Sequence, residues 1–242
     1  MMKQIVFWTV RSIVWVLIHI VFRIYGGIRF EGRHNVPKRG GVLITPNHFS
    51  DADPPTMGIA LPRACYFMTK EELFHIKFWG GLIKILRGFP IKRNTADRAA
   101  LRRCEELLKA GEAVVVFPEG KLSEDGTLKP FLPGALMAAQ RAGVPIVPVG
   151  LVATDKLMPY GLIKPRHAGQ PIIVRFGKPI TVAELTNNAK GGDALKLGAE
   201  RLGLLVQALL DGNWEYTLPP IMPKTASEST ENREPEREAV PS

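Results

Sequence analysis

The sequence predicts an α/β fold in which helices flank a mixed, largely parallel sheet. Short apolar segments rich in β-branched residues alternate with longer segments of helical periodicity, which is the pattern of strand–helix–strand units. The chain starts with an almost wholly apolar segment, and its last twenty residues are rich in Glu, Ser, Thr and Pro. The predicted divisions are a membrane-associating helix over residues 1–24, an α/β domain over 25–222 and a disordered tail over 223–242.

The apolar segment covers residues 5–22 and is near the lower length limit for a membrane span. Its polar residues recur at a helical period and so fall on one side; with the flanking ones they are Gln4, Arg11, His19 and Arg23. Trp8 and Trp15 suit the membrane–water interface. We therefore expect a peripheral, monotopic helix that lies in one leaflet, with a single span as the alternative.

Basic residues in and after this segment favour the cytoplasmic face of the inner membrane. They are Lys3, Arg11, Arg23, Arg29 and Arg33. No small-residue cleavage site follows the segment, so a cleaved signal peptide is not expected.

The sheet and its helices are predicted from local periodicity. Continuous β-branched runs, such as Ala-Val-Val-Val-Phe at 113–117, are typical of strands covered on both faces. The predicted strands span residues 41–45, 113–117, 145–151 and 171–176. The predicted helices span residues 97–110, 134–142 and 193–210. Asp97 suits the start of the first of these helices, and Gly111 suits its end.

The charge distribution points to an anionic partner. The net charge is +9, although the tail holds five glutamates against three basic residues. A basic folded part suggests membrane lipid, nucleotide or nucleic acid as the partner. Residues 78–87 interleave basic and apolar side chains, as in a surface that binds anionic lipid, although a solvated helix face is the alternative. Nucleic-acid binding is not expected, because no recognised binding motif is present.

The two cysteines, Cys65 and Cys104, form no C-x-x-C pair and have no metal-ligand spacing. Both lie among apolar residues, so they are interpreted as core residues of a protein in a reducing compartment. No metal site is predicted.

Two polar clusters directly follow two of the predicted strands, at residues 46–53 and 118–121. Ligands of open α/β sheets bind outside the carboxyl ends of the strands, so the two clusters are expected to share one crevice. In the first cluster His48 is the natural proton acceptor, since an imidazole exchanges protons near neutral pH. A carboxylate would orient it, and the spacing leaves both Asp51 and Asp53 as candidates. The alternative is that His48 and the aspartates only cap a loop and the next helix.

The sequence lacks the motifs of several other chemistries. There is no G-x-S-x-G elbow to carry a nucleophile and no G-x-G-x-x-G loop. Gly120-Lys121 lacks the remainder of a phosphate-binding P-loop, because Val115 and Leu122 occupy two of its required positions. A Walker-type nucleotide site is therefore rejected.

Four motifs in order, over about residues 25 to 180, resemble the glycerolipid acyltransferases typified by bacterial 1-acyl-glycerol-3-phosphate acyltransferase. The family pattern N-H-x-x-x-x-D matches residues 47–53, and a Gly-led stretch ending in Arg matches 88–93. The pattern F-P-E-G matches 117–120, and an apolar run with prolines matches 144–149. The sequence is thus identified as similar to this family.

The resemblance implies that His48 removes the proton from an acceptor hydroxyl as it attacks an acyl thioester, and that Asp53 orients and charge-stabilises His48. It also implies that Arg93 binds the acceptor phosphate, since a guanidinium makes two parallel hydrogen bonds to it. Glu119 and Gly120 would complete the acceptor site.

The third motif departs from the family pattern, in which an Arg follows Thr. Leu122 stands at that position, and Lys121, one place earlier, is the candidate to supply the charge. This departure concerns the identity of the acceptor, which could also be glycerol-3-phosphate, another lysophospholipid or a lyso-aminolipid.

The implied partners are an anionic membrane lipid, the lysophospholipid acceptor and an acyl donor. The donor is acyl-CoA or an acyl-acyl carrier protein, which acts as co-substrate, so no cofactor is expected. A membrane-binding relative without turnover and a hydrolase in which His48 activates water are the alternatives from other classes.

Overall fold

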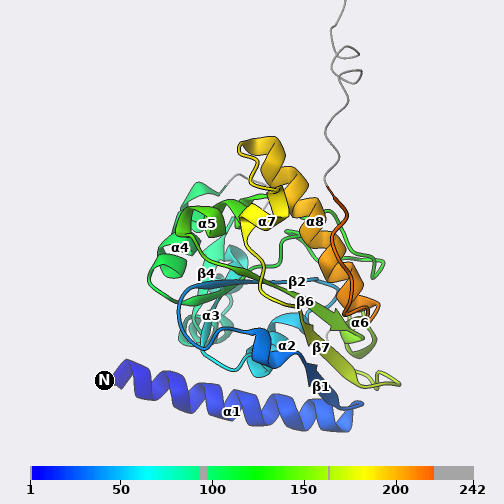
Figure 1. Ribbon diagram of the computed structural model, residues 1–242. Helices are drawn as coiled ribbons and strands as arrows, with labels where there is room; N and C mark the ends of the chain where they lie inside the picture. The colour runs from blue at the N-terminus through cyan, green and yellow to red at the C-terminus, as the bar shows by residue number, and fades with distance from the viewer. Residues whose placement is uncertain (1, 93–96, 163, 221–242) are drawn as a thin grey trace, which may run out of the picture.

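The computed structural model describes residues 2–92, 97–162 and 164–220. They form one seven-stranded sheet in the order β1-β7-β6-β2-β5-β3-β4, with helices on both faces (Figure 1). The strands are β1 (Ile28–Glu31), β2 (Val42–Pro46), β3 (Cys65–Lys70), β4 (Gly88–Ile91), β5 (Ala113–Val115), β6 (Ile146–Val152) and β7 (Ile172–Phe176). The helices are α1 (Met2–Ile24), α2 (Asp53–Ala60), α3 (Trp79–Ile85), α4 (Arg98–Lys109), α5 (Gly134–Ala142), α6 (Thr154–Leu157), α7 (Val182–Thr186) and α8 (Gly192–Leu210), with short 3-10 turns η1 (Arg33–Asn35) and η2 (Glu71–His75).

The sheet is mixed and mostly parallel, as predicted. Strands β6, β2, β5, β3 and β4 run in one direction, and β7 and β1 run in the opposite direction, because β7 pairs antiparallel with β6 and β1 pairs parallel with β7. The central strands β2 and β5 are buried along their whole length, as their continuous apolar runs require. Because β2 and β5 are parallel neighbours, the segments that follow them emerge at the same edge of the sheet.

Successive residues of β2 serve two separate cores. Leu43 belongs to the core under α4, α5 and α8, and Ile44 belongs to the core under α2, because side chains alternate across a strand. The predicted helix at 97–110 is confirmed as α4, and Asp97 caps it by accepting a hydrogen bond from the Ala100 N–H at 2.9 Å.

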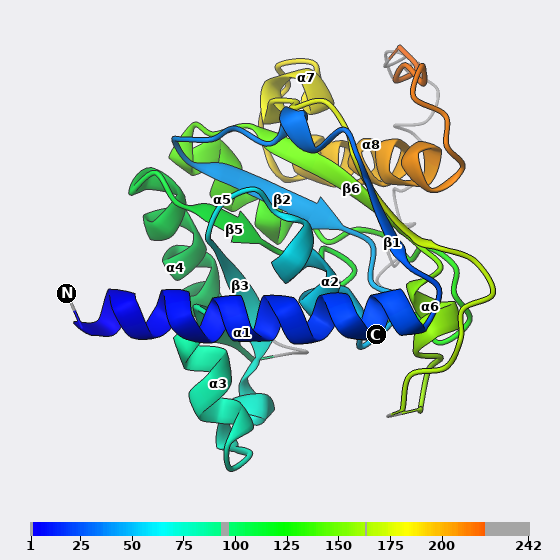
Figure 2. The ribbon, with the colours of Figure 1, turned by 90° about the horizontal axis from the view of Figure 1, so that it is seen from below.

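Helix α1 lies along the α2 side of the sheet, where it contacts α2, α3 and β1 (Figure 1, Figure 2). Phe22 is 3% exposed and packs with Ala52, Ile59 and Ile172. Near the other end, Phe7 is buried beneath the Arg87 guanidinium, which lies 4.4 Å from the ring centroid. The helix is therefore attached to the α/β body at both ends.

The outward side of α1 is apolar. Segment Gln4–Ile24 is long and apolar enough to cross a membrane. Its exposed large apolar side chains are Ile5, Val6, Trp8, Ile13, Trp15, Val16, Leu17, Ile20, Val21 and Ile24. Within the predicted polar stripe, Arg11 and His19 are half-buried, whereas Gln4 and Arg23 are exposed. The predicted tail at 223–242 lies outside the described residues.

Candidate functional site

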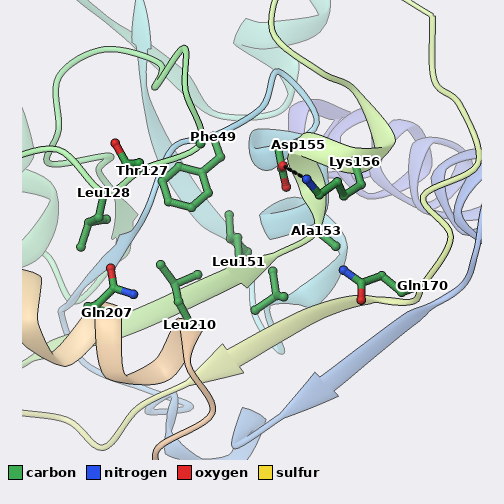
Figure 3. Close-up of a pocket in the computed structure, with 12 residues that line it drawn as sticks. Phe49, Thr127, Leu128, Leu151, Ala153, Asp155, Lys156, Gln170, Gln207 and Leu210 are labelled. Carbon is green, nitrogen blue, oxygen red and sulfur yellow. Dashed lines mark ion pairs between the residues drawn. The ribbon is translucent and has the colours of Figure 1, made fainter.

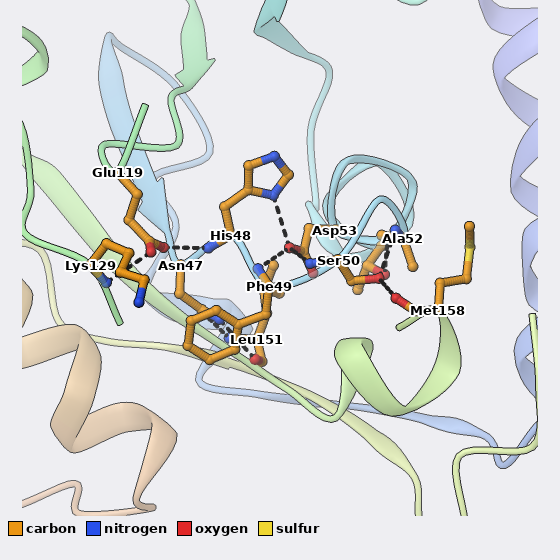
Figure 4. A network of polar contacts seen from close by, with 11 residues as sticks. Asn47, His48, Phe49, Ser50, Ala52, Asp53, Glu119, Lys129, Leu151 and Met158 are labelled. Atoms are coloured by element: carbon orange, nitrogen blue, oxygen red, sulfur yellow. Dashed lines mark hydrogen bonds and ion pairs between the residues drawn. The ribbon is translucent and has the colours of Figure 1, made fainter. Parts of the chain in front are cut away.

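The loop between β2 and α2 carries the predicted proton acceptor. It runs from Asn47 to Ala52, and Asp53 opens α2. The Asp53 N–H donates to the Ser50 carbonyl at 3.0 Å, which folds the chain back so that Asp53 faces His48. The distance between His48 Nδ1 and Asp53 Oδ2 is 3.0 Å, and Figure 4 shows the two side chains pointing toward each other.

Asp53 does more than contact the imidazole. Its Oδ2 atom also accepts hydrogen bonds from the backbone N–H groups of Phe49, at 2.7 Å, and Ser50, at 2.8 Å. Asp53 is fully buried, whereas Asp51 is exposed. Of the two aspartates that spacing left as candidates, Asp53 is the one that contacts the imidazole, and the same oxygen also binds two backbone N–H groups of the loop.

The imidazole of His48 stacks on Phe117, the first residue of the F-P-E-G motif. The ring centroids are 4.2 Å apart, and the ring planes are inclined by 28°. With Nδ1 facing Asp53, the atom left to accept a proton is Nε2. No group in the described parts of the chain forms a hydrogen bond with Nε2. This is the arrangement that a general base needs.

Glu119 follows β5 and reaches the His48 loop through the backbone. One carboxylate oxygen accepts the His48 N–H at 2.6 Å, and the other accepts the Lys129 N–H at 2.9 Å. Burial raises the pKa of Glu119 to about 7, against the lowering effect of these two hydrogen bonds. The two polar clusters thus meet, as predicted, and both carboxylate oxygens of Glu119 bind backbone groups.

Two further contacts join the loop to its surroundings, and sequence reasoning assigned no role to the residues that make them. The Asn47 amide donates to the Leu151 carbonyl at 3.1 Å and accepts the Leu151 N–H at 2.7 Å, so it continues the pairing of β2 with β6. The Ser123 N–H donates to the His48 carbonyl at 2.8 Å. An amide side chain directly after a buried strand was the available signal for Asn47.

The segment after Glu119 is also ordered by hydrogen bonds. Asp125 accepts hydrogen bonds from the side chains of Lys129, Thr127 and Ser123, and these hold the pKa of Asp125 well below its usual range, with Lys129 the largest cause. This turn presents the Lys129 N–H to Glu119.

The other predicted binding residues are Gly120, Lys121 and Arg93. Gly120 has a φ of 73°, a conformation that favours glycine, and donates its N–H to the Phe117 carbonyl at 3.1 Å. Lys121 is exposed beside this turn. Arg93 lies outside the described residues.

A pocket of about 390 Å³ lies next to the His48 loop, but it is not lined by the imidazole. Phe49 projects into it together with Leu128, Leu151 and Gln207 (Figure 3). In Figure 4 the side chains of His48 and Phe49 leave the loop in opposite directions. The pocket is therefore a neighbour of the candidate site and not the place where the imidazole acts.

Comparisons with known proteins agree with this geometry. The model of the family described as Acyltransferase matches residues 27–152, which include His48, Asp53 and Glu119. A 1-acyl-sn-glycerol-3-phosphate acyltransferase of Bacillus subtilis is 34% identical over 131 residues, which are 53% of this chain and 64% of that protein. The chloroplastic 1-acyl-sn-glycerol-3-phosphate acyltransferase BAT2 of Brassica napus is 37% identical over 134 residues, 54% of this chain and 39% of that protein.

The chain thus spans between about two fifths and two thirds of the lengths of these relatives. The crystal structure of the 1-acyl-sn-glycerophosphate acyltransferase PlsC from Thermotoga maritima shares the fold, with a TM-score of 0.65 at 24% identity over 85% of this chain and 82% of that one. Because the family model covers half of the chain and spans the His48–Asp53 pair, the chain belongs to the acyltransferase family.

Proposed function

We propose that this protein transfers a fatty acyl group from an acyl thioester to the free hydroxyl of a lysophospholipid, with 1-acyl-glycerol-3-phosphate as the acceptor and phosphatidic acid as the product. The observation that carries the proposal is the buried His48–Asp53 pair, which leaves Nε2 as a proton acceptor at the edge of the sheet. The names of the relatives supply the acceptor.

The reaction needs one base and no enzyme nucleophile. His48 Nε2 takes the proton of the acceptor hydroxyl while the oxygen attacks the thioester carbonyl carbon. The carbon–sulfur bond then breaks, and the imidazolium returns the proton to the leaving thiolate, so an ester and a free thiol are formed. Asp53 stabilises the imidazolium through Nδ1. A thioester is already activated, so no covalent acyl-enzyme is required.

Acceptor recognition is assigned to the second and third motifs. Arg93 would bind the acceptor phosphate, and the exposed Lys121 would add a positive charge beside it. We assign Glu119 a positioning role, because both of its oxygens bind backbone N–H groups. Gly120 would permit the turn that carries Glu119.

The remaining partners follow from the chemistry of the substrates. The donor would be acyl-CoA or an acyl-acyl carrier protein, both of which are anionic and suit a basic protein with a net charge of +9. The outward apolar side of α1 supports association with a membrane. We assign this association to the cytoplasmic face because of the basic residues in and after α1. The acceptor could then react without leaving the bilayer.

Release of free thiol from an acyl thioester tests the proposal. Purified protein is offered the thioester alone and then with 1-acyl-glycerol-3-phosphate, glycerol-3-phosphate, other lysophospholipids or a lyso-aminolipid. We expect thiol release to depend on 1-acyl-glycerol-3-phosphate and to be abolished by His48→Ala. Release without acceptor would instead indicate a hydrolase, and no release with any acceptor would indicate a binding protein.

A further inference from the structure

A second exposed apolar group lies beside α1, in the segment that joins β3 to α3. Phe78 is 78% exposed and Trp79 is 56% exposed, and Ile76 and Leu73 are also exposed. Residues 76–79 are called the aromatic tip here. Four large apolar side chains open to water within seven residues mark a surface that contacts something other than water.

The backbone of the aromatic tip is shaped so that the ring of Phe78 points outward. Phe78 has φ 70° and ψ −53°, and the Trp79 N–H donates to the Lys77 carbonyl at 2.9 Å, which together define a γ-turn. A bulky residue rarely adopts this conformation. Strain of this kind is retained where function needs a particular presentation of a side chain.

The aromatic tip is held firmly relative to α1. The Gly80 N–H donates to the Ile76 carbonyl at 2.9 Å, and buried Gly80 packs closely on the Phe74 backbone. Arg87, directly after α3, lies over the ring of Phe7 in α1. Figure 2 shows α3 projecting beyond α1, and the two helices are in contact. The aromatic tip thus leads into the helix that packs beside α1.

The aromatic tip follows a strand whose carboxyl end lies at the same end of the sheet as the candidate site. Turn η2 follows β3 directly, and β3 pairs in parallel with β5, whose end leads to Glu119. Strand β2, whose end leads to His48, is the next parallel neighbour of β5. Turn η2, which leads into the aromatic tip, therefore leaves the sheet at the same end as the segments that carry His48 and Glu119.

The charge around the aromatic tip favours an anionic lipid surface. Lys77, within the aromatic tip, and Lys84, in α3, are both exposed. Of the nearby acids, Glu72 lies 4.0 Å from Lys70, and Glu71 is half-buried. Aromatic rings with adjacent lysines are the side chains that bind the headgroup region of a bilayer.

From these observations we propose that the aromatic tip inserts into the membrane as a second contact beside α1, and that the two contacts together turn the His48 edge of the sheet toward anionic lipid. The inference rests on the proposed function in one respect, namely that the acceptor resides in the bilayer.

Labelling measures the depth of the aromatic tip directly. Burial raises the pKa of both native thiols, Cys65 and Cys104, to about 12, so a nitroxide attaches selectively to an engineered cysteine. Phe78→Cys is compared with Leu204→Cys, another exposed apolar position, which lies on α8 at the other face of the sheet from α2. On vesicles of phosphatidylcholine and phosphatidylglycerol, the label at 78 should become accessible to oxygen and shielded from a water-soluble nickel complex, while the label at 204 should not change.

Substitution measures the contribution of the aromatic tip. Phe78→Ser should weaken vesicle binding about ten-fold and slow transfer to a bilayer-embedded acceptor by a similar factor, since one buried aromatic ring contributes that much. Leu204→Ser should change neither. The inference is overturned if the label at 78 stays in contact with water on vesicles that bind the protein, or if Phe78→Ser binds as tightly as the unchanged protein.

A soluble assay separates this inference from the proposed function. With a short-chain thioester and a short-chain acceptor below their micelle concentrations, Phe78→Ser should transfer at the unchanged rate. Loss of that soluble activity in Phe78→Ser would overturn the inference, because it would place the residue in the reaction itself. Absence of soluble activity in the unchanged protein, with correct insertion of the label, would instead overturn the proposed function alone.

Discussion

Asp53 and His48 are joined through a single oxygen atom that also shapes the loop between them. Asp53 Oδ2 lies 3.0 Å from His48 Nδ1 and accepts the backbone N–H groups of Phe49 and Ser50 as well. The other oxygen, Oδ1, is buried without a hydrogen-bond partner in the described residues. Orientation of the imidazole and closure of the loop therefore depend on the same carboxylate.

Asp53→Asn should keep the fold and lose most of the activity. The amide oxygen can still accept the two backbone N–H groups, but a neutral amide stabilises an imidazolium far less than a carboxylate does. We expect the rate of thiol release to fall by about 10²- to 10⁴-fold. Asp51→Asn is the matched control, because Asp51 is exposed two residues earlier, and it should retain the rate. Equal rates in the two variants would rule out the assigned pair.

Glu119 should make stability depend on pH. Burial raises its pKa from the ordinary 4.5 to about 7, so between these values the folded protein binds more protons at this group than the unfolded chain does. The free energy of unfolding contributed by Glu119 therefore falls as pH rises from about 4.5 to 7, by about 3 kcal/mol at most. Glu119→Gln should remove this contribution to the pH dependence of the unfolding free energy. Denaturant titrations at several pH values between about 4.5 and 7 measure that dependence.

The quantity compared is the difference in unfolding free energy between the unchanged protein and Glu119→Gln at each pH, because other carboxyl groups titrate in both proteins. Glu119→Gln should also lower the rate of thiol release, since an amide cannot accept both the His48 and the Lys129 N–H groups. A pH dependence of stability that is unchanged by the substitution would contradict the raised pKa.

Asn47 should contribute to both stability and activity, although its amide takes no part in the reaction. Asn47→Ala leaves the buried N–H and carbonyl of Leu151 without their partner and should cost about 2 to 4 kcal/mol of unfolding free energy. It should also slow thiol release, because His48 is the next residue. Asn35→Ala removes one hydrogen bond, to the Phe176 carbonyl, far from the loop. It should cost about 1 kcal/mol and leave the rate unchanged; equal losses of rate would refute the role of Asn47.

Four neighbouring strands, β7, β6, β2 and β5, could be predicted from the sequence, whereas β1, β3 and β4 could not; the predicted strands at 145–151 and 171–176 correspond to β6 and β7. The predicted strands at 41–45 and 113–117 correspond to β2 and β5, because burial on both faces requires a continuous apolar run. Strand β3 is half-buried along most of its length, and the edge strand β4 contains Pro90, so neither has such a pattern. Strand β1, at the other edge, is four residues long and carries charged residues.

Within the site, contacts between two reactive side chains could be predicted from the sequence, whereas contacts to the backbone could not. The pair of His48 and Asp53 is local in sequence and joins two reactive side chains, so spacing and resemblance sufficed to predict it. The contact of Glu119 joins residues 71 positions apart through a backbone N–H, which no residue pattern encodes. The assigned role of Arg93 stays a prediction, because that residue lies outside the described parts of the chain.

Gly120 should be required for activity more than for stability. Gly120 and Gly143 both have positive φ, 73° and 67°, so alanine at either position should cost about 1 kcal/mol. The exposed side chain of Leu132 can turn away from an added Cβ at Gly120, so backbone strain is the main effect at both positions, and the two differ in that only Gly120 follows Glu119 directly. Gly120→Ala should therefore shift the turn that carries Glu119 and slow thiol release, and Gly143→Ala should not. Equal rates in the two variants, measured at a temperature where both are folded, would contradict this.

The two sides of α1 should respond to substitution in opposite ways. Leu17 is 57% exposed, so Leu17→Gln should leave unfolding unchanged and reduce the fraction of protein bound to vesicles. Phe22 is 3% exposed and packs against Ala52, one residue from Asp53. Phe22→Ala should cost about 3 to 5 kcal/mol of unfolding free energy while the outward apolar side stays intact. If Leu17→Gln destabilised the fold as much as Phe22→Ala, the outward side of α1 would be packing on protein and not on lipid.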